Sequence, residues 1–255
     1  MPKNIQYHIA CGEGDIGGYC LLPGDPGRVA EIARYLDNPI KIAANREFVT
    51  YSGFLAGQEV TVTSTGIGGP SAAIALEELA KLGAHTVIRI GTCGGIASFV
   101  RGGDIVIATA ACRQEGTSRE YAPIEYPAAA DYSVVAALHA VAEEQGLRWH
   151  TGVVQSKDSF YGQHEPERMP VAEELAAKWQ AFRRLNVLAS EMETAAIFVA
   201  AAALNVRAGA VLQVLWNKDR RAEGLPDETV TDTTAVIEVA ISALAKIIQV
   251  DKVGC

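Results

Sequence analysis

Short apolar runs alternate with segments of helical periodicity along most of the chain. The apolar runs predict strands at 19–22, 85–90, 104–110, 151–155 and 208–216. The run at 104–110 is so uniformly apolar that we expect its strand to be buried on both faces. Residues 48–55 and 60–64 carry β-branched and aromatic side chains on either side of Ala56 and Gly57, which predicts a β-hairpin.

Between these runs, apolar residues recur every three or four positions, as in amphipathic helices. The pattern predicts helices at 29–36, 71–82, 131–145, 171–185, 191–204 and 229–250. Strand and helix units alternate without a linker or an internal repeat. We therefore predict a single α/β domain over residues 1–255, a three-layer fold with a central mixed, largely parallel β-sheet flanked by helices. Functional loops are expected where strands end.

Charge narrows the classes of function. The 255 residues include 22 Lys+Arg and 30 Asp+Glu, a formal net charge of -8, and no basic run. A nucleic-acid backbone would be repelled at long range, so nucleic acid is not an expected partner. Any phosphate that the chain binds must be held locally, by a few residues in one place.

The cysteines and the N-terminus indicate a cellular compartment. The five cysteines are spread widely and include no C-x-x-C pair: Cys11, Cys20, Cys93, Cys112 and Cys255. This favours reduced thiols over a disulfide frame or a zinc site. The N-terminus has no apolar core of signal-peptide length, and later apolar stretches are interrupted by polar residues. We expect a cytoplasmic protein with no membrane partner.

Two features of the sequence suit an anion. Gly24 and Gly27 lie in a loop between a strand and a helix, where backbone N–H groups can approach an anion, and Arg28 follows in the first turn. An ordinary turn is the alternative interpretation of this loop. Arg89 interrupts an apolar strand, and a buried guanidinium needs a partner. It therefore predicts either a structural carboxylate or a bound anion.

Two further features suit a sugar and a planar base. Glu191 and Glu193 lie at the start of a predicted helix that is otherwise so apolar that it must be largely buried. Carboxylates there favour the helix dipole, and each can also accept two hydrogen bonds from a vicinal diol. Phe160, Gln163 and Arg168 combine a ring, an amide and a guanidinium, which together can stack on and hydrogen-bond a heterocycle, although a surface loop is the alternative.

Several common catalytic motifs are missing from the sequence. Residues 66–69 lack the third glycine of a dinucleotide fingerprint, and neither a P-loop nor an H-E-x-x-H motif occurs. Cys93 has no base beside it in the sequence, so we expect it to pack as a small apolar residue.

Six strings, in one order, resemble the nucleoside phosphorylase family, and within it the members that cleave uridine. They are Pro-Gly-Asp-Pro at 23–26, Asn-Arg-Glu-Phe at 45–48, Ser-Thr-Gly-Ile-Gly-Gly-Pro-Ser at 64–71, Arg-Ile-Gly-Thr-Cys-Gly-Gly at 89–95, Phe-Tyr-Gly-Gln-His-Glu-Pro-Glu-Arg at 160–168 and Ser-Glu-Met-Glu at 190–193. The resemblance covers nearly the whole chain. It implies reversible phosphorolysis of uridine to uracil and ribose 1-phosphate in pyrimidine salvage, with inorganic phosphate as co-substrate and neither a cofactor nor a required metal.

The resemblance also implies a role for each matching residue. The phosphate site it implies consists of Gly24, Arg28, Arg46, Arg89 and Thr92. The ribose site consists of His8, Met192 and Glu193, and the base site of Phe160, Gln163 and Arg168. The catalytic residues that the resemblance implies are Arg28, Arg46, Arg89, Arg168, Thr92 and Glu193.

The family resemblance further implies an oligomer. His8 and Arg46 match residues that reach across a dimer interface, so we expect a dimer as the smallest active unit and a hexamer as the assembly. Glu47, Ile67 and Ser71 match positions that bind a monovalent cation at this interface in some members.

Two positions depart from the family pattern. In some relatives the base-reading Gln and Arg are two residues apart, whereas residues 164–167 stand between Gln163 and Arg168, which leaves the contact of Arg168 open. Purine-acting members place an Asp where this chain has Asn217, and this favours a pyrimidine. Purine phosphorolysis and nucleoside binding without turnover remain alternatives. Hydrolysis by water is disfavoured because it would not need the phosphate-site arginines.

Overall fold

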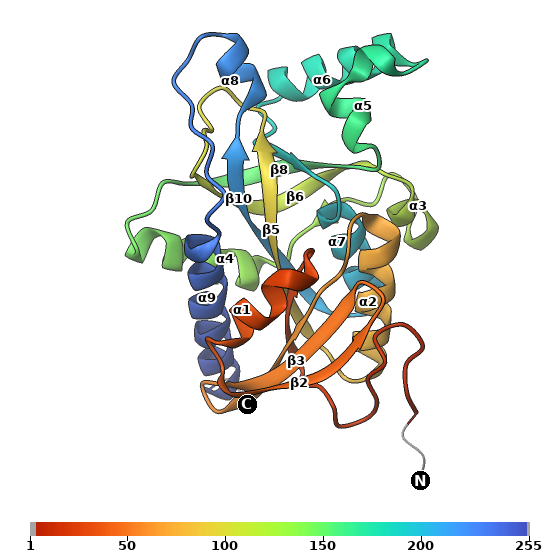
Figure 1. Cartoon of the computed structure of the whole chain (residues 1–255), viewed down its shortest axis with the longest axis vertical. Coiled ribbons are helices and arrows are strands. Elements are labelled where there is room, and N and C mark those ends of the chain that lie inside the picture. Colours follow the sequence, from red (N-terminus) through yellow and green to blue (C-terminus); the bar gives the residue numbers. More distant parts are fainter. Residues whose placement is uncertain (1–3, 254–255) are drawn as a thin grey trace.

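The computed structural model describes residues 4–253. Within these residues, ten strands form one sheet that runs through the centre of the molecule (Figure 1). The strands are β1 (Tyr19–Pro23), β2 (Asp37–Asn45), β3 (Phe48–Leu55), β4 (Gln58–Thr63), β5 (Thr86–Gly95), β6 (Ile105–Gln114), β7 (Ala128–Ala129), β8 (Trp149–Lys157), β9 (Ala189–Glu191) and β10 (Arg207–Trp216). The helices are η1 (Pro26–Arg28), α1 (Val29–Ala33), α2 (Gly69–Lys81), α3 (Thr117–Tyr121), α4 (Tyr132–Glu144), α5 (Phe160–His164), η2 (Pro166–Arg168), α6 (Ala172–Arg184), α7 (Thr194–Ala203), α8 (Lys218–Ala222) and α9 (Thr234–Val253).

The strand order closes part of the sheet on itself. The order is β10-β6-β8-β9-β5-β1-β4-β3-β2, with β7 off this path beside β6, and β10 also pairs with β5. This last pairing joins β5, β10, β6, β8 and β9 into a ring, from which β1, β4, β3 and β2 extend as an open sheet.

The direction of the strands differs in part from the prediction. Of the ten pairings between described strands, five are parallel and five antiparallel, so the sheet is mixed but not largely parallel. The antiparallel pairings come from the β2–β3–β4 meander, from the short strands β7 and β9, and from β6 beside β10. Alternation of strands and helices predicts parallel neighbours only where a helix provides the crossover.

Helices cover both faces of the sheet, which confirms the predicted layers. Side chains of β1 alternate between two apolar clusters, with Cys20 and Leu22 in one and Tyr19 and Leu21 in the other. Helices α2 and α7 complete the first cluster, and α1, α4 and α9 complete the second, so α2 and α9 lie on opposite sides in Figure 1. Burial of each large apolar side chain contributes about 1.5–3 kcal/mol.

Most predicted elements are present, with shifted ends. The strand predicted to end at residue 90 continues as β5 to Gly95, because Gly94 and Gly95 pair with Ser190 and Ala189 of β9. No helix in the described part of the chain combines the length and the apolar character needed to cross a membrane. Cys20, Cys93 and Cys112 form no disulfide within the described residues, and Cys255 lies outside them.

Candidate active site

A cavity of about 600 Å³ lies where β1, β5 and β10 end. Four segments far apart in the sequence form most of its wall: the loop after β1, the residues before α2, the end of β5 and the β9–α7 connection. A second cavity of about 330 Å³ adjoins it, and Lys157 lines both. The strands therefore bring together loops that the sequence analysis treated as separate candidates.

One part of the cavity is built for an anion. Arg28 and Arg89 both line it, and each has a buried Nη1 atom with no hydrogen-bond partner among the described residues. The backbone at Gly24 is close, since a Cβ added there would lie 4.0 Å from Arg89 Nη1. Burial and then the charge of Arg89 lower the pKa of Arg28. Two neighbouring cations, Arg89 buried and Arg28 half-buried, each with an open buried donor, favour binding of an anion between them.

Arg89 is held in place by two carboxylates. It is 3% exposed, its Nε donates to Glu191 Oε2 at 3.0 Å, and its Nη2 donates to Glu193 Oε2 at 2.5 Å. Burial opposes its charge, but Glu193 and Glu191 raise the pKa of Arg89 above its usual value. The sequence left a carboxylate and an anion as alternatives, and the structure provides carboxylates for Nε and Nη2 while Nη1 stays open.

Glu191 and Glu193 have different surroundings. Glu191 accepts hydrogen bonds from the backbone N–H groups of Glu193 and Thr194 and from Ser156 Oγ, so it caps α7. Glu193 Oε1 accepts from the N–H of Gly68 at 2.5 Å, in a loop where Gly68 has φ +88. Burial raises the pKa of Glu193 more than Arg89 lowers it. Each Glu193 oxygen keeps a second acceptor position, so this carboxylate can still bind hydroxyl groups.

Aromatic and polar side chains from α5 and β10 line another part of the cavity. Phe160 and His164 lie one helical turn apart with ring centroids at 4.3 Å, and both line the cavity together with Trp216. Ser159 caps α5 by accepting from the N–H of Gly162 at 2.9 Å. Burial, and then the charge of Lys157, lower the pKa of His164, so its ring is neutral at pH 7. A planar ligand can stack here.

Most of the predicted site residues meet in the larger cavity. The residues that line it are Gly24, Arg28, Arg89, Thr92, Phe160, Met192 and Glu193, together with Glu47, Ile67 and Ser71 of the predicted cation site. Ser71 Oγ donates to Glu47 Oε1 at 3.1 Å. No cluster of three or more His, Cys, Asp or Glu side chains suited to a metal occurs within residues 4–253.

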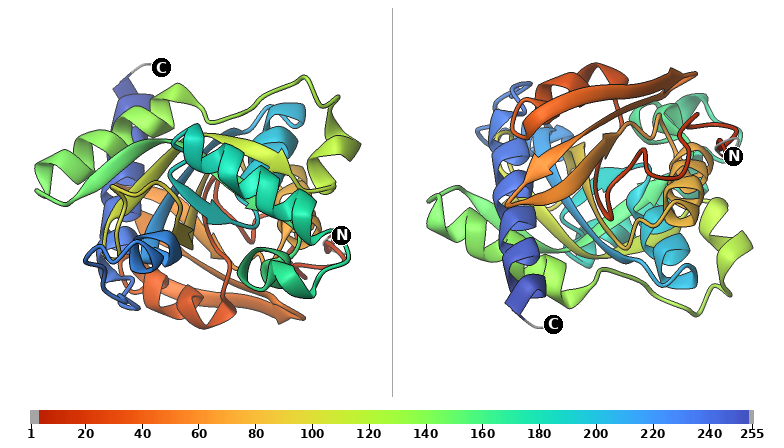
Figure 2. Two further views of the ribbon diagram at one scale, coloured as in Figure 1. Left: turned by 90° about the horizontal axis from the view of Figure 1, so that it is seen from above. Right: turned by 90° about the horizontal axis from the view of Figure 1, so that it is seen from below.

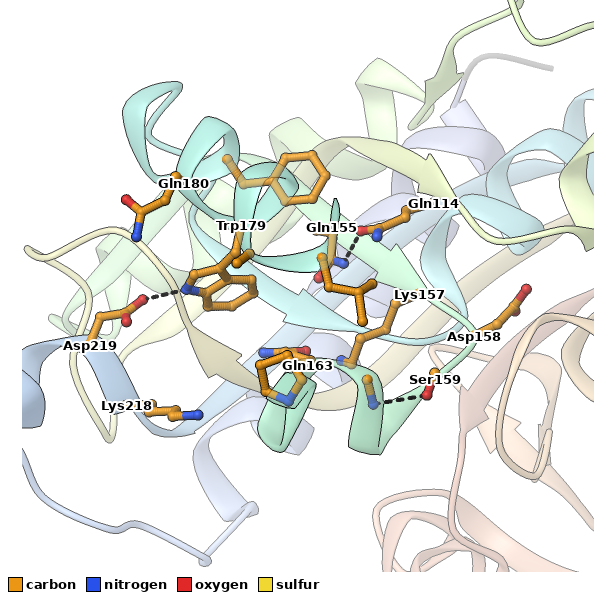
Figure 3. A pocket seen from close by; sticks show the side chains of 15 residues that line it. Gln114, Gln155, Lys157, Asp158, Ser159, Gln163, Trp179, Gln180, Lys218 and Asp219 are labelled. Atoms are coloured by element: carbon orange, nitrogen blue, oxygen red, sulfur yellow. Dashed lines mark hydrogen bonds between the residues drawn. The ribbon is translucent and has the colours of Figure 1, made fainter. Parts of the chain in front are cut away.

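Four predicted residues do not line this cavity. His8 Nδ1 contacts Glu78 Oε1 at 2.7 Å, where the N-terminal segment runs beside α2 (Figure 2). Arg46 is exposed in the β2–β3 turn with φ +54. Gln163 lines the adjoining cavity (Figure 3). Its Oε1 lies 2.6 Å from Ser190 Oγ.

The fourth is Arg168, which lies in η2 after the five-residue helix α5. Its Nη1 pairs with Glu165, and its side chain is 64% exposed. The residues inserted between Gln163 and Arg168 form the end of α5 and the start of η2, and they place Arg168 outside both cavities.

Asn217, used to argue for a pyrimidine, is a structural residue at the start of α8. It is fully buried, and its Nδ2 donates to the carbonyl oxygens of Ala97 at 2.9 Å and Val100 at 2.7 Å. Its Oδ1 accepts from the N–H groups of Asp219 and Arg220, which makes it the helix cap. Because this side chain does not line the cavity, its identity says little about the base.

Cys93 and Lys157 also line the cavity. Burial raises the pKa of the Cys93 thiol, and Cys93 belongs to the apolar core as predicted, so it is a poor nucleophile. Lys157 was missed. The signal available in the sequence was a lysine two residues after the end of the apolar strand predicted at 151–155.

Comparisons of the sequence with known proteins found related phosphorylases. The family model described as "Phosphorylase superfamily" matches residues 19–250. The uridine phosphorylase of Treponema pallidum is 53% identical over 248 residues, covering 97% of this chain and 96% of the relative. The uridine phosphorylase of Thermococcus kodakarensis is 43% identical, with 96% and 88% covered. The guanosine phosphorylase of Halorubrum lacusprofundi is 37% identical, with 94% and 98% covered.

Proposed function

The chain belongs to the phosphorylase superfamily, and from that premise we propose that it catalyses the reversible phosphorolysis of uridine to uracil and ribose 1-phosphate. The observation that carries the proposal is the pair of open donors, Arg28 Nη1 and Arg89 Nη1, in the wall of a cavity that also holds the Glu193 carboxylate. An anion site beside a carboxylate that can bind a diol suits a reaction in which phosphate attacks a ribose.

Phosphate is the co-substrate in this proposal. It is bound by Gly24, Arg28, Arg89 and Thr92, and by Arg46 from a neighbouring subunit. Each charge-assisted hydrogen bond contributes about 1.5–3 kcal/mol when well placed. Arg46 suits this role because it is exposed in a turn, from which it can reach a second copy of the chain.

The nucleoside occupies the rest of the cavity. Glu193 accepts hydrogen bonds from the 2′- and 3′-hydroxyl groups beside Met192, and His8 of a neighbouring subunit meets the 5′-hydroxyl. Phe160 stacks on the base and Gln163 hydrogen-bonds its edge. Arg168 reaches the base only after leaving Glu165, so its contact with the base stays a prediction.

The reaction replaces one bond at the anomeric carbon with another. A phosphate oxygen forms a bond to C1′ while the bond from C1′ to N1 breaks, and the electron pair leaves with uracil, which then takes a proton. The sugar develops oxocarbenium character, which the bound phosphate anion stabilises. The residues of the chain bind and orient both substrates and supply the surrounding charge.

We further place this activity in pyrimidine salvage in the cytoplasm, performed by an oligomer, a dimer at least and a hexamer by family resemblance. The thiols Cys20, Cys93 and Cys112 support a reducing compartment. The positions of His8 and Arg46 outside the cavity support sites completed by a neighbour. A monovalent cation near Glu47, Ile67 and Ser71 belongs to the same proposal.

The test is a substrate panel measured with and without phosphate. Uridine in phosphate buffer should give uracil and ribose 1-phosphate, and omission of phosphate should abolish uracil release. Release that persists without phosphate would mean hydrolysis. Faster turnover of inosine or guanosine than of uridine would move the assignment to a purine nucleoside, the base class named in one relative. Binding of uridine by calorimetry without turnover would show a binding protein.

A further inference from the structure

We propose that Gln155 is a positioning residue, which sets the orientation of the Gln163 amide and thereby makes the site select uracil over cytosine. Gln155 acts through the hydroxyl group of Ser190, which contacts both amides. The inference rests on the proposed function, in which Gln163 hydrogen-bonds the edge of the base, and it names the residue that fixes this amide.

A chain of hydrogen bonds leads through the protein to Gln163. Gln155 is 2% exposed in β8, and Ser190 is 3% exposed in β9. Gln155 Nε2 donates to Gln114 Oε1 at 2.5 Å, as Figure 3 shows, and Gln155 Oε1 contacts Ser190 Oγ. Ser190 Oγ also lies 2.6 Å from Gln163 Oε1. The three glutamines line the adjoining cavity and Ser190 lines the larger one, so this chain lies where the two cavities meet.

The single proton of Ser190 Oγ forces the two amides into opposite orientations. A hydroxyl group has one proton and two acceptor positions. Lys157 Nζ donates to one of these positions at 2.8 Å; burial lowers the pKa of Lys157 to about 8, so at pH 7 it is mainly protonated. The Ser190 proton can go to Gln155 or to Gln163, and the amide that does not receive it must donate its NH₂ group to the second acceptor position.

Gln155 takes the proton in this structure. Its Nε2 already donates to Gln114 Oε1, so its oxygen faces Ser190. Gln163 therefore turns its NH₂ group to Ser190 and its oxygen away from it. Without the Gln155 oxygen, the same proton would have Gln163 Oε1 as its acceptor, and the NH₂ group of Gln163 would face the other way.

The two orientations of the Gln163 amide suit different pyrimidines. With its NH₂ group on Ser190, the amide offers one acceptor and one remaining N–H, which complement the N3–H and a neighbouring carbonyl oxygen of uracil. With its oxygen on Ser190, it places an N–H against position 3 of the base. This donor matches N3 of cytosine, which is an acceptor, and opposes the N3–H of uracil. A site that hydrogen-bonds one edge strongly rejects an edge that leaves its polar groups unpaired.

Calorimetry in phosphate-free buffer at pH 7 tests the inference, through the ratio of the Kd for cytidine to the Kd for uridine. Gln155→Met removes the amide at nearly constant volume, so Ser190 donates to Gln163. The ratio should fall by about 10–100-fold, because a matched hydrogen bond to uridine is replaced by two facing donors. Gln155→Glu introduces a carboxylate, which only accepts, so Ser190 still donates away from Gln163 and the ratio should stay within about threefold of wild type.

Two further variants separate this role from a general loss of packing. Ser190→Ala removes the hydroxyl group that fixes Gln163, so the ratio should fall here too, which covers the case that Gln155→Met does not fold. Gln180→Met makes the same exchange in α6, in the wall of the same cavity, and should leave the ratio within about threefold of wild type.

The outcomes distinguish this inference from the proposed function. Equal weakening of uridine and cytidine binding in Gln155→Met, or an equal fall of the ratio in Gln155→Glu or Gln180→Met, would overturn the role of Gln155. A wild-type protein that prefers uridine to cytidine but releases no uracil in phosphate would instead overturn the proposed function.

Discussion

An Arg28→Met variant is expected to lose phosphate affinity while keeping its stability. Arg28 Nη1 is buried without a hydrogen-bond partner, and burial together with the charge of Arg89 lowers the pKa of Arg28. Removing the Arg28 charge therefore relieves a repulsion in the empty protein and leaves no buried carboxylate unpaired. The Arg89→Met variant should behave differently, because it removes the cation that pairs with both Glu191 and Glu193.

The two variants should differ in what they lose: Arg28→Met loses phosphate affinity, and Arg89→Met loses folding stability. Loss of a charge-assisted hydrogen bond to phosphate costs about 1.5–3 kcal/mol, which corresponds to a roughly 10- to 150-fold weaker phosphate Kd for Arg28→Met. Breaking a buried ion pair by removing one partner costs about 3–5 kcal/mol of folding free energy. At about 2–4 °C per kcal/mol for a chain of this size, Arg89→Met should lower Tm by about 6–20 °C.

Thermal unfolding at a series of phosphate concentrations measures both quantities. A ligand that binds only the folded state raises stability by RT ln(1 + [L]/Kd), so the rise of Tm with phosphate reports Kd. Without phosphate, Arg28→Met should melt within about 2 °C of wild type, and it should need at least tenfold more phosphate for the same rise. A Tm loss in Arg28→Met as large as that in Arg89→Met, or an unchanged response to phosphate, would refute this reasoning.

Three further outcomes are expected. Glu193→Gln should lower kcat/KM for uridine by about 10²-fold or more, because the NH₂ group of the amide would face another donor, either the Gly68 N–H or the Arg89 guanidinium. Steady-state kinetics measures this loss, with circular dichroism as a check on folding, and a loss below about threefold would contradict the expectation. Asn217→Ala should lower the free energy of unfolding in denaturant by about 2–4 kcal/mol and leave the preference for uridine over inosine unchanged. A changed preference would instead show that Asn217 takes part in base recognition. Arg46→Ala and Arg28→Met, each weakly active alone, should regain activity when unfolded and refolded together, and the absence of complementation would contradict a site shared between subunits.

The fold was largely predictable because its core elements carry regular patterns. The alternation of apolar residues in β3 and β4 and the spacing in α2 and α4 gave strands and helices close to those observed. β2 was missed because most of its residues are exposed and Pro39 interrupts it. β9 has three residues and is a strand only through its partners in β5 and β8, so no local pattern announces it.

The site was predictable where a residue is unusual in its own segment. Arg89 in an apolar strand and Glu193 before an apolar helix are conspicuous in the sequence, and the structure brings them together. Lys157 is not conspicuous, because a lysine after a strand is usually solvated. Its burial comes from β9 and α5, whose positions depend on the whole sheet. The nearness of Arg28 to Arg89 was equally beyond reach, because it depends on the positions of two strands and not on any local pattern.

The ring of strands has a consequence for how the protein is made. β5 completes its pairing only with β10, and Arg207 contacts Thr86 across 121 residues of sequence. Arg89 meets its two carboxylates across 102 and 104 residues. Contacts this distant in sequence form late and slowly, because a long loop must close before they give any stability. A nascent chain that has not yet passed residue 193 therefore has Arg28 and Arg89 but lacks the Glu193 carboxylate that holds Arg89, so the site cannot form before that point in synthesis.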